Sequence, residues 1–152
     1  LEDVRRAYRV AKKVGLETRG SVILGLPYDT KETVRNTIEF VKSLNDCDQA
    51  YFNIAMPYPG TEMREMAFRG EGGIRLLTKD YTELRRHGNV VMEVNDLNRD
   101  DLLQLQKQAW LSFFLTPRRI LYNFFRAGLK AGIINGYAFI RSFLFHKGRI
   151  DT

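Results

Sequence analysis

The stretch Arg19-Gly20-Ser21-Val22-Ile23-Leu24-Gly25-Leu26-Pro27 decides the expected fold. Its apolar centre is short and is closed by a glycine and a proline, which predicts a strand buried on both faces, as in a parallel sheet. Asp29 follows as a candidate N-cap, and Glu32 completes a capping box three residues later. We therefore expect a strand over about 18–24 and then a helix that ends near Leu44.

Helix and strand signals alternate on both sides of this stretch. Residues 2–14 place apolar side chains at helical spacing, and residues 49–56 predict a second strand. Pro57-Tyr58-Pro59-Gly60 stops that strand, and Thr61 can cap a short helix that runs through Phe68. Strands that alternate with helices predict parallel β-α units, so the expected fold class is α/β.

The remainder of the chain predicts a different organisation. Residues 69–97 are rich in glycine and form an expected connecting loop region, with a short strand near 89–94. A helix then starts at Asn98 with the apolar stripe Leu102, Leu105, Ala109 and Phe113. We expect three parts: β-α units over 1–68, the connection over 69–97, and a helical extension with a basic tail over 98–152.

The charge is distributed very unevenly. Residues 1–116 hold 17 basic and 17 acidic side chains, whereas residues 117–152 hold seven basic and one acidic, so the net charge of +6 lies in the tail. The tail predicts helices near 118–127 and 132–146, for which three interpretations stay open. They pack on the domain with a solvated basic rim, they contact an anionic membrane surface through residues 117–150, or, least favoured, they bind nucleic acid.

The composition excludes several kinds of site. A single cysteine, Cys47, excludes a disulfide framework, and two histidines leave few metal ligands, so no metal site is expected in this chain. We interpret Cys47 as a semi-buried structural thiol and His87 as a polar loop residue. The apolar stretch 133–145 is shorter than the roughly 20 residues of a membrane span.

The two strand exits are the candidate ligand site, because ligands of parallel α/β folds bind beyond the carboxyl ends of the strands. Residues 22–27 and 54–61 both end there, and neither segment offers a nucleophile or an acid–base pair. They present backbone and apolar surface, which suits a flat ligand. The alternative is an ordinary turn that needs glycine and proline for its geometry.

Residues 19–27, with Thr30-Lys31-Glu32-Thr33 and with Pro57-Tyr58-Pro59-Gly60-Thr61 after the next strand, resemble the fifth- and sixth-strand region of radical S-adenosylmethionine enzymes. The resemblance covers about residues 1–68 and is nearest to the branch with cobalamin-binding members, anaerobic cyclases and methylthiotransferases. It implies the C-terminal part of a partial (β/α)6 barrel, followed by an α-helical extension.

The resemblance also implies cofactors and site residues. The full-length enzyme would use a [4Fe-4S] cluster to cleave S-adenosylmethionine to a 5′-deoxyadenosyl radical, and cobalamin is a further candidate cofactor. Ile23 would touch the adenine, Gly25 would admit it, and backbone near Ile54 and Ala55 would bind its edge. Candidates for the substrate pocket are Pro27, Met56 and Tyr58, and no catalytic residue is identified.

The chain departs from that family where it has Ser21 and Tyr28, and it lacks the three cysteines that would bind the cluster. We therefore expect a fragment that is inactive alone and needs a preceding N-terminal part of the same chain to act on an unidentified substrate. Unpaired sheet edges make a homodimer of the fragment plausible. The alternative function is an α/β binding module whose basic tail docks on an anionic membrane or a partner protein. A cytoplasmic location, with peripheral membrane contact through the tail, is expected.

Overall fold

The computed structural model describes residues 1–84 and 89–122. The chain divides into two compact units, Leu1–Phe113 and Phe114–Thr152. In the first unit the elements are α1 (Glu2–Lys13), β1 (Arg19–Leu24), α2 (Lys31–Lys42), β2 (Gln49–Ile54), α3 (Glu62–Arg69), β3 (Ile74–Leu76), a short 3₁₀ turn (Tyr81–Glu83), β4 (Met92–Val94) and α4 (Arg99–Phe114), whose last residue begins the second unit. The fold class is therefore α/β with short sheets, as predicted, and the three-part division at residues 68 and 97 stays a prediction.

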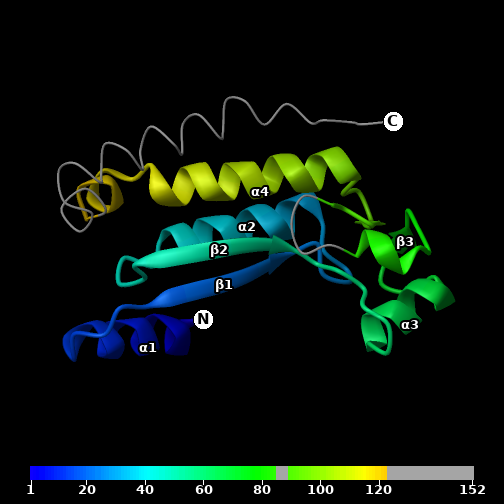
Figure 1. The fold of residues 1–152 in the computed structure, drawn as a ribbon. Coiled ribbons are helices and arrows are strands. Elements are labelled where there is room, and N and C mark those ends of the chain that lie inside the picture. The colour runs from blue at the N-terminus through cyan, green and yellow to red at the C-terminus, as the bar shows by residue number, and fades with distance from the viewer. Residues whose placement is uncertain (85–88, 123–152) are drawn as a thin grey trace. The chain divides into compact units, whose positions relative to one another are not determined.

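The central sheet consists of β1 and β2, which pair in parallel and are joined by α2 (Figure 1). Side chains alternate between the two faces. Gly20 and Leu24 of β1, and Ala50 and Phe52 of β2, point to one face and are buried. On the opposite face Ile23 remains 48% exposed. The expectation of a strand buried on both faces is therefore not met, because the described residues cover only one face of this sheet.

The sheet is held against α4 by aromatic packing along β2. Phe52 makes edge-on contacts with Trp110 and Phe113, with ring centroids 6.2 and 6.1 Å apart. The Gln106 side chain donates to the Phe52 carbonyl at 2.7 Å, so α4 also satisfies a backbone acceptor on the outer edge of β2. The predicted helix start is confirmed, because the Asp101 amide donates to Asn98 Oδ1 and the Asn98 amide donates to Asp101 Oδ2. The predicted apolar stripe is buried as a whole: Leu102, Leu105, Ala109 and Phe113.

The region predicted as a connecting loop contains more regular structure than expected. β3 and β4 form an antiparallel pair, of which only the second strand was expected near its position. Ile74, Met92 and Val94 of this pair form a small apolar cluster with Ala55. Arg75 and Glu93 face each other across the pair and form an ion pair. A three-residue strand such as β3 is too short for a periodic signal, which is why the sequence does not reveal it.

In the second unit the description reaches residue 122, and residues 117–122 are helical. The amides of Arg119 and Ile120 both donate to the Thr116 carbonyl at 3.0 Å. Most of the basic tail, including the predicted helix at 132–146 and the apolar stretch at 133–145, lies outside the described residues. No helix in the described part of the chain is long and apolar enough to cross a membrane. The predicted partners of the tail remain predictions.

A buried carboxylate ties α1 to the start of both strands. Asp48 forms an ion pair with Lys12 of α1, and its other oxygen accepts the Thr18 amide at 3.0 Å. Burial by itself would raise the pKa of Asp48. The hydrogen bonds from Lys12 and Thr18 outweigh that effect and hold the pKa below its ordinary value of 3.8. The ionised form of Asp48 therefore stabilises the folded protein.

Substituting Asp48→Asn should lower the free energy of unfolding at pH 7 by about 1 kcal/mol, because it removes the charged acceptor of the hydrogen bonds from Lys12 and Thr18. Since the folded-state pKa is the lower one, this contribution is complete above the unfolded-state value and is lost as the pH falls through the folded-state value. Denaturation curves from pH 7 to pH 3 should show wild type and variant converging below about pH 4. A constant difference over that range would contradict the account.

Candidate ligand pocket at the strand exits

The turn that follows β1 is organised by the carboxylate of Asp29. One of its oxygens accepts the amides of Gly25 and Leu26 at 3.1 and 2.9 Å, and the other accepts the Thr33 hydroxyl at 2.7 Å. Asp29 is thus not the N-cap of α2 as predicted. Thr30 takes that place and forms a reciprocal capping box with Thr33, because the Asp29 carboxylate is already occupied by the turn.

Two loops from outside the central sheet hold the same turn in place. The Tyr28 amide donates to the Gly72 carbonyl at 2.8 Å, and the Asn95 side chain donates to the Asp29 carbonyl at 2.8 Å. The Asn95 amide in turn donates to the Gly73 carbonyl at 2.9 Å. These contacts fix the path of the chain between β1 and α2.

The exit of β2 is held by α3. Thr61 caps this helix by accepting the Arg64 amide at 3.3 Å and donates its hydroxyl to the Tyr58 carbonyl at 2.7 Å. The Arg64 guanidinium is buried, donates to the Pro57 carbonyl at 3.3 Å and lies over the Phe68 ring. The cap of α3 and the buried Arg64 therefore hold the backbone carbonyls of Tyr58 and of the preceding Pro57.

A pocket of about 310 Å³ lies where the two strands end. This volume is at the lower end of the range typical of small-molecule sites. Five of the predicted site residues line it, namely Ile23, Ile54, Ala55, Met56 and Tyr58. The structure therefore brings together residues from both strand exits, and their predicted roles toward a ligand stay predictions.

Two predicted site residues lie outside the lining. Gly25 is buried, and a Cβ at this position would lie 2.9 Å from Leu102 Cδ2, so its lack of a side chain makes room for α4. Pro27 is half-buried, and its Cβ lies 2.9 Å from the position that a Cβ on Gly72 would take. Glycine and proline in this motif thus serve the packing of the turn in this structure.

The backbone of Ala55 is already engaged. Its amide donates to the Leu24 carbonyl at 2.8 Å, as part of the pairing between the strands, so it is not available to a ligand. Backbone groups of successive strand residues point to opposite edges, and Ile54 therefore shares the outer edge of β2 with the Phe52 carbonyl. Hydrogen bonding by the Ala55 carbonyl or by Ile54 stays a prediction.

Sequence reasoning missed three lining residues, which are Ser21, Asn53 and Met63, whereas Leu26 lies within the predicted strand-exit segment 22–27. Asn53 stands beside Ile23 in the register, and its side chain donates to the Ser21 hydroxyl at 3.4 Å. Both residues are polar side chains of the sheet that line the pocket. Period-two alternation from Ile23 would have found Ser21, and the strand register would then have found Asn53.

Groups suited to metal binding are absent from the described part of the chain, in which no cluster of three or more His, Cys, Asp or Glu residues is close enough to hold an ion. Cys47 is fully buried, and its thiol donates to the Gln49 carbonyl at 3.1 Å. Burial and the neighbouring Cys47 raise the pKa of Tyr8 to about 12, and neither residue lines the pocket. His87 and the adjacent Arg85 and Arg86 lie outside the described residues.

Comparison with known proteins gave one informative relative, while no protein-family model matches the chain. An uncharacterized methyltransferase of Pyrococcus horikoshii is 36% identical over 119 residues. The matched region is 78% of this chain but only 25% of the relative, so the chain spans about a quarter of that protein's length.

The relative's name corrects the resemblance drawn from the strand-exit motifs. It indicates methyl transfer, so the assignment to the radical S-adenosylmethionine family, with radical cleavage of that cofactor, is wrong. The predictions of an iron–sulfur cluster and of cobalamin depended on that assignment and are therefore also wrong. Among the described residues, no cluster of side chains could hold a metal ion. The alternative of a membrane-docking module gains no support from the comparison. The motif led to a wrong family because its glycine and proline reflect the geometry of a strand exit and carry no information about the reaction.

Gly73 offers a test of the loops that hold the β1 exit. A Cβ there would lie 1.9 Å from Asn95 Oδ1, whereas a Cβ at Gly70, which has the same left-handed backbone, would meet nothing within 4 Å. Gly73→Ala should therefore lower the free energy of unfolding by about 1 kcal/mol more than Gly70→Ala, which is the value of the displaced Asn95 hydrogen bond. In an Asn95→Ala background the difference should vanish. Equal losses in the wild-type background would show that Asn95 does not fix the turn.

Proposed function

We propose that this chain forms part of an S-adenosylmethionine-dependent methyltransferase, in which the strand-exit pocket binds the cofactor's adenosine portion. The observation that carries the proposal is the position of the pocket at the carboxyl ends of two parallel strands. The name of the Pyrococcus horikoshii relative supplies the reaction class. S-Adenosylmethionine supplies an activated methyl group, and the contribution of this chain is to bind and orient it.

The lining suits a purine. Ile23, Ile54 and Met56 offer apolar surface against which a flat ring can pack, and half of Ile23 is exposed toward solvent. The Asn53 side chain carries both a donor and an acceptor, so it can pair with one edge of the ring while Ser21 holds its orientation. Such an arrangement gives affinity through apolar contact and selectivity through one polar pair.

The lining supports binding rather than proton transfer. Among the described residues, the pocket wall contains no carboxylate, histidine or lysine, and Tyr58 carries its only ionisable side chain. A general base for the methyl acceptor would therefore come from outside this wall. Methyl transfer from a sulfonium needs correct alignment of acceptor and methyl group above all, and a rigid binding wall serves that need.

The proposal also implies a larger sheet. Among the described residues β1 pairs only with β2, and a parallel sheet of two strands with one open face is not a stable unit by itself. We propose that β1 and β2 belong to a larger parallel sheet of the partial (β/α)6-barrel kind, with the exposed face of Ile23 and Asn53 toward its interior. The pocket would then be one sector of a larger cavity.

The test is to measure cofactor affinity by calorimetry in the complete natural polypeptide that contains this chain. Ile23→Ala should raise the Kd of S-adenosylmethionine about fivefold, because the half-exposed side chain loses roughly 1 kcal/mol of apolar contact. The matched control is Leu77→Ala, which removes a side chain of similar exposure outside the pocket and should leave the Kd unchanged. An unbound cofactor in the wild type, or equal Kd values in both variants, would overturn the proposal.

A further inference from the structure

Tyr28 occupies a backbone position that its residue type disfavours. Leu26 to Asp29 form a tight turn, in which the Asp29 amide donates to the Leu26 carbonyl at 3.0 Å. Pro27 stands second in this turn, and Tyr28, with a φ of 69°, stands third. A turn with proline second and positive φ third is of type II, and its third position normally holds glycine or asparagine. A tyrosine there is a strained choice.

The surroundings maintain this strain. The Tyr28 amide is held by the Gly72 carbonyl, and the next peptide carbonyl, that of Asp29, is held by the Asn95 side chain. Asp29 closes the turn from within by accepting the Leu26 amide. Residue 28 therefore keeps its left-handed conformation whatever its side chain, so the tyrosine ring is not what shapes the turn.

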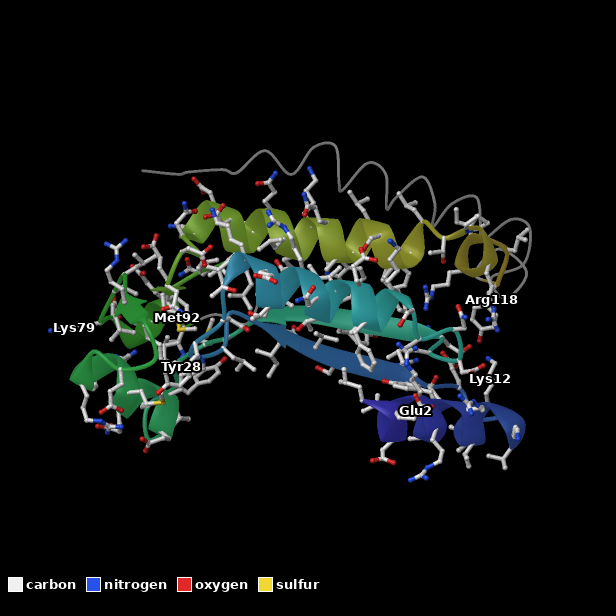
Figure 2. The ribbon with its side chains drawn as sticks, turned by 180° about the vertical axis from the view of Figure 1, so that it is seen from behind. Glu2, Lys12, Tyr28, Lys79, Met92 and Arg118 are labelled. Atoms are coloured by element: carbon white, nitrogen blue, oxygen red, sulfur yellow. The ribbon has the colours of Figure 1, made fainter. Side chains whose placement is uncertain are left out.

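Packing does not explain the ring either. The Tyr28 residue is 69% exposed, and within the part of the chain that the structure describes its hydroxyl has no hydrogen-bond partner. Figure 2 shows Tyr28 beyond the carboxyl end of β1, next to α3 in that view. Leu26, two residues earlier in the same turn, and Met63 of α3 both line the pocket. Tyr28 itself does not line the pocket, but it stands on a rigid turn whose first residue, Leu26, does, and its ring is largely exposed to solvent.

We propose that Tyr28 is a ligand-contacting residue of this pocket and that its ring packs against the purine of S-adenosylmethionine. Strained conformations that neighbouring contacts maintain are concentrated at ligand-binding positions, where they present a side chain that a relaxed turn would not carry. The inference rests on the proposed function. It adds a second, aromatic surface for the purine, supplied by the turn, to the aliphatic surface supplied by the strands.

The experiment compares Tyr28→Asn and Tyr28→Phe with wild type in the complete polypeptide, by calorimetry for the Kd and by thermal melting. Asparagine suits the left-handed backbone but removes the ring, so Tyr28→Asn should melt at the same or a higher temperature and bind S-adenosylmethionine about tenfold more weakly. Tyr28→Phe keeps the ring face and should restore most of the affinity. 5′-Methylthioadenosine, which retains the purine but lacks the amino-acid part, should lose affinity by the same factor.

A Tyr28→Asn variant with wild-type affinity would overturn the inference, and so would a clear fall in its melting temperature, because the ring would then serve the fold. A weakened S-adenosylmethionine complex with unchanged affinity for 5′-methylthioadenosine would also overturn it, because the purine would not be the group contacted. If wild type binds the cofactor and Ile23→Ala weakens it while Tyr28→Asn does not, only this inference fails. If wild type does not bind the cofactor, the proposed function fails with it.

Discussion

The site depends on one interaction at the end of β1, in which the Asp29 carboxylate accepts hydrogen bonds from the Gly25 and Leu26 amides. Strand β1 ends there, and its backbone amides would otherwise point into a turn without acceptors. Because the carboxylate is used in this way, the cap of α2 moves to Thr30, and the turn can present Leu26 to the pocket. The outer loops then need only two contacts, through Gly72 and Asn95, to hold the turn rigid.

Periodic features could be predicted from the sequence, and features set by single long-range contacts could not. The helices α1 to α4, the two parallel strands and the buried stripe of α4 follow from the spacing of apolar residues, and the structure agrees closely on each. The role of Asp29 could not be read locally, because the same pattern fits an N-cap equally well. The contact of Gly25 with α4 could not be read locally either, because a Cβ there would meet Leu102, a residue 77 positions later in the chain. That Gly25 admits a ligand stays a prediction.

The residues that line the pocket likewise divide into those that could be predicted from the sequence and those that could not. The segments 22–27 and 54–61 were predicted as the ligand site because strand ends meet at one edge of a parallel sheet, which is a topological rule. The family resemblance then singled out Ile23, Ile54 and Ala55 within them, and all three line the pocket. Asn53 was missed because it becomes a neighbour of Ile23 and Ser21 only once the strand register is known. The reaction class could not be derived from the sequence or from the structure of the pocket. Apolar walls and glycine-proline turns bind flat ligands in many enzymes, so the relative's name was needed to correct the radical chemistry and to suggest the proposed methyl transfer.

The most direct test of the central claim is a structure of the complete natural polypeptide bound to S-adenosylhomocysteine, the product form of the cofactor. The account predicts the purine against Ile23, within hydrogen-bond distance of the Asn53 side chain, at the exits of β1 and β2. A purine bound elsewhere in the polypeptide, with these residues still facing solvent or another part of the protein, would contradict it.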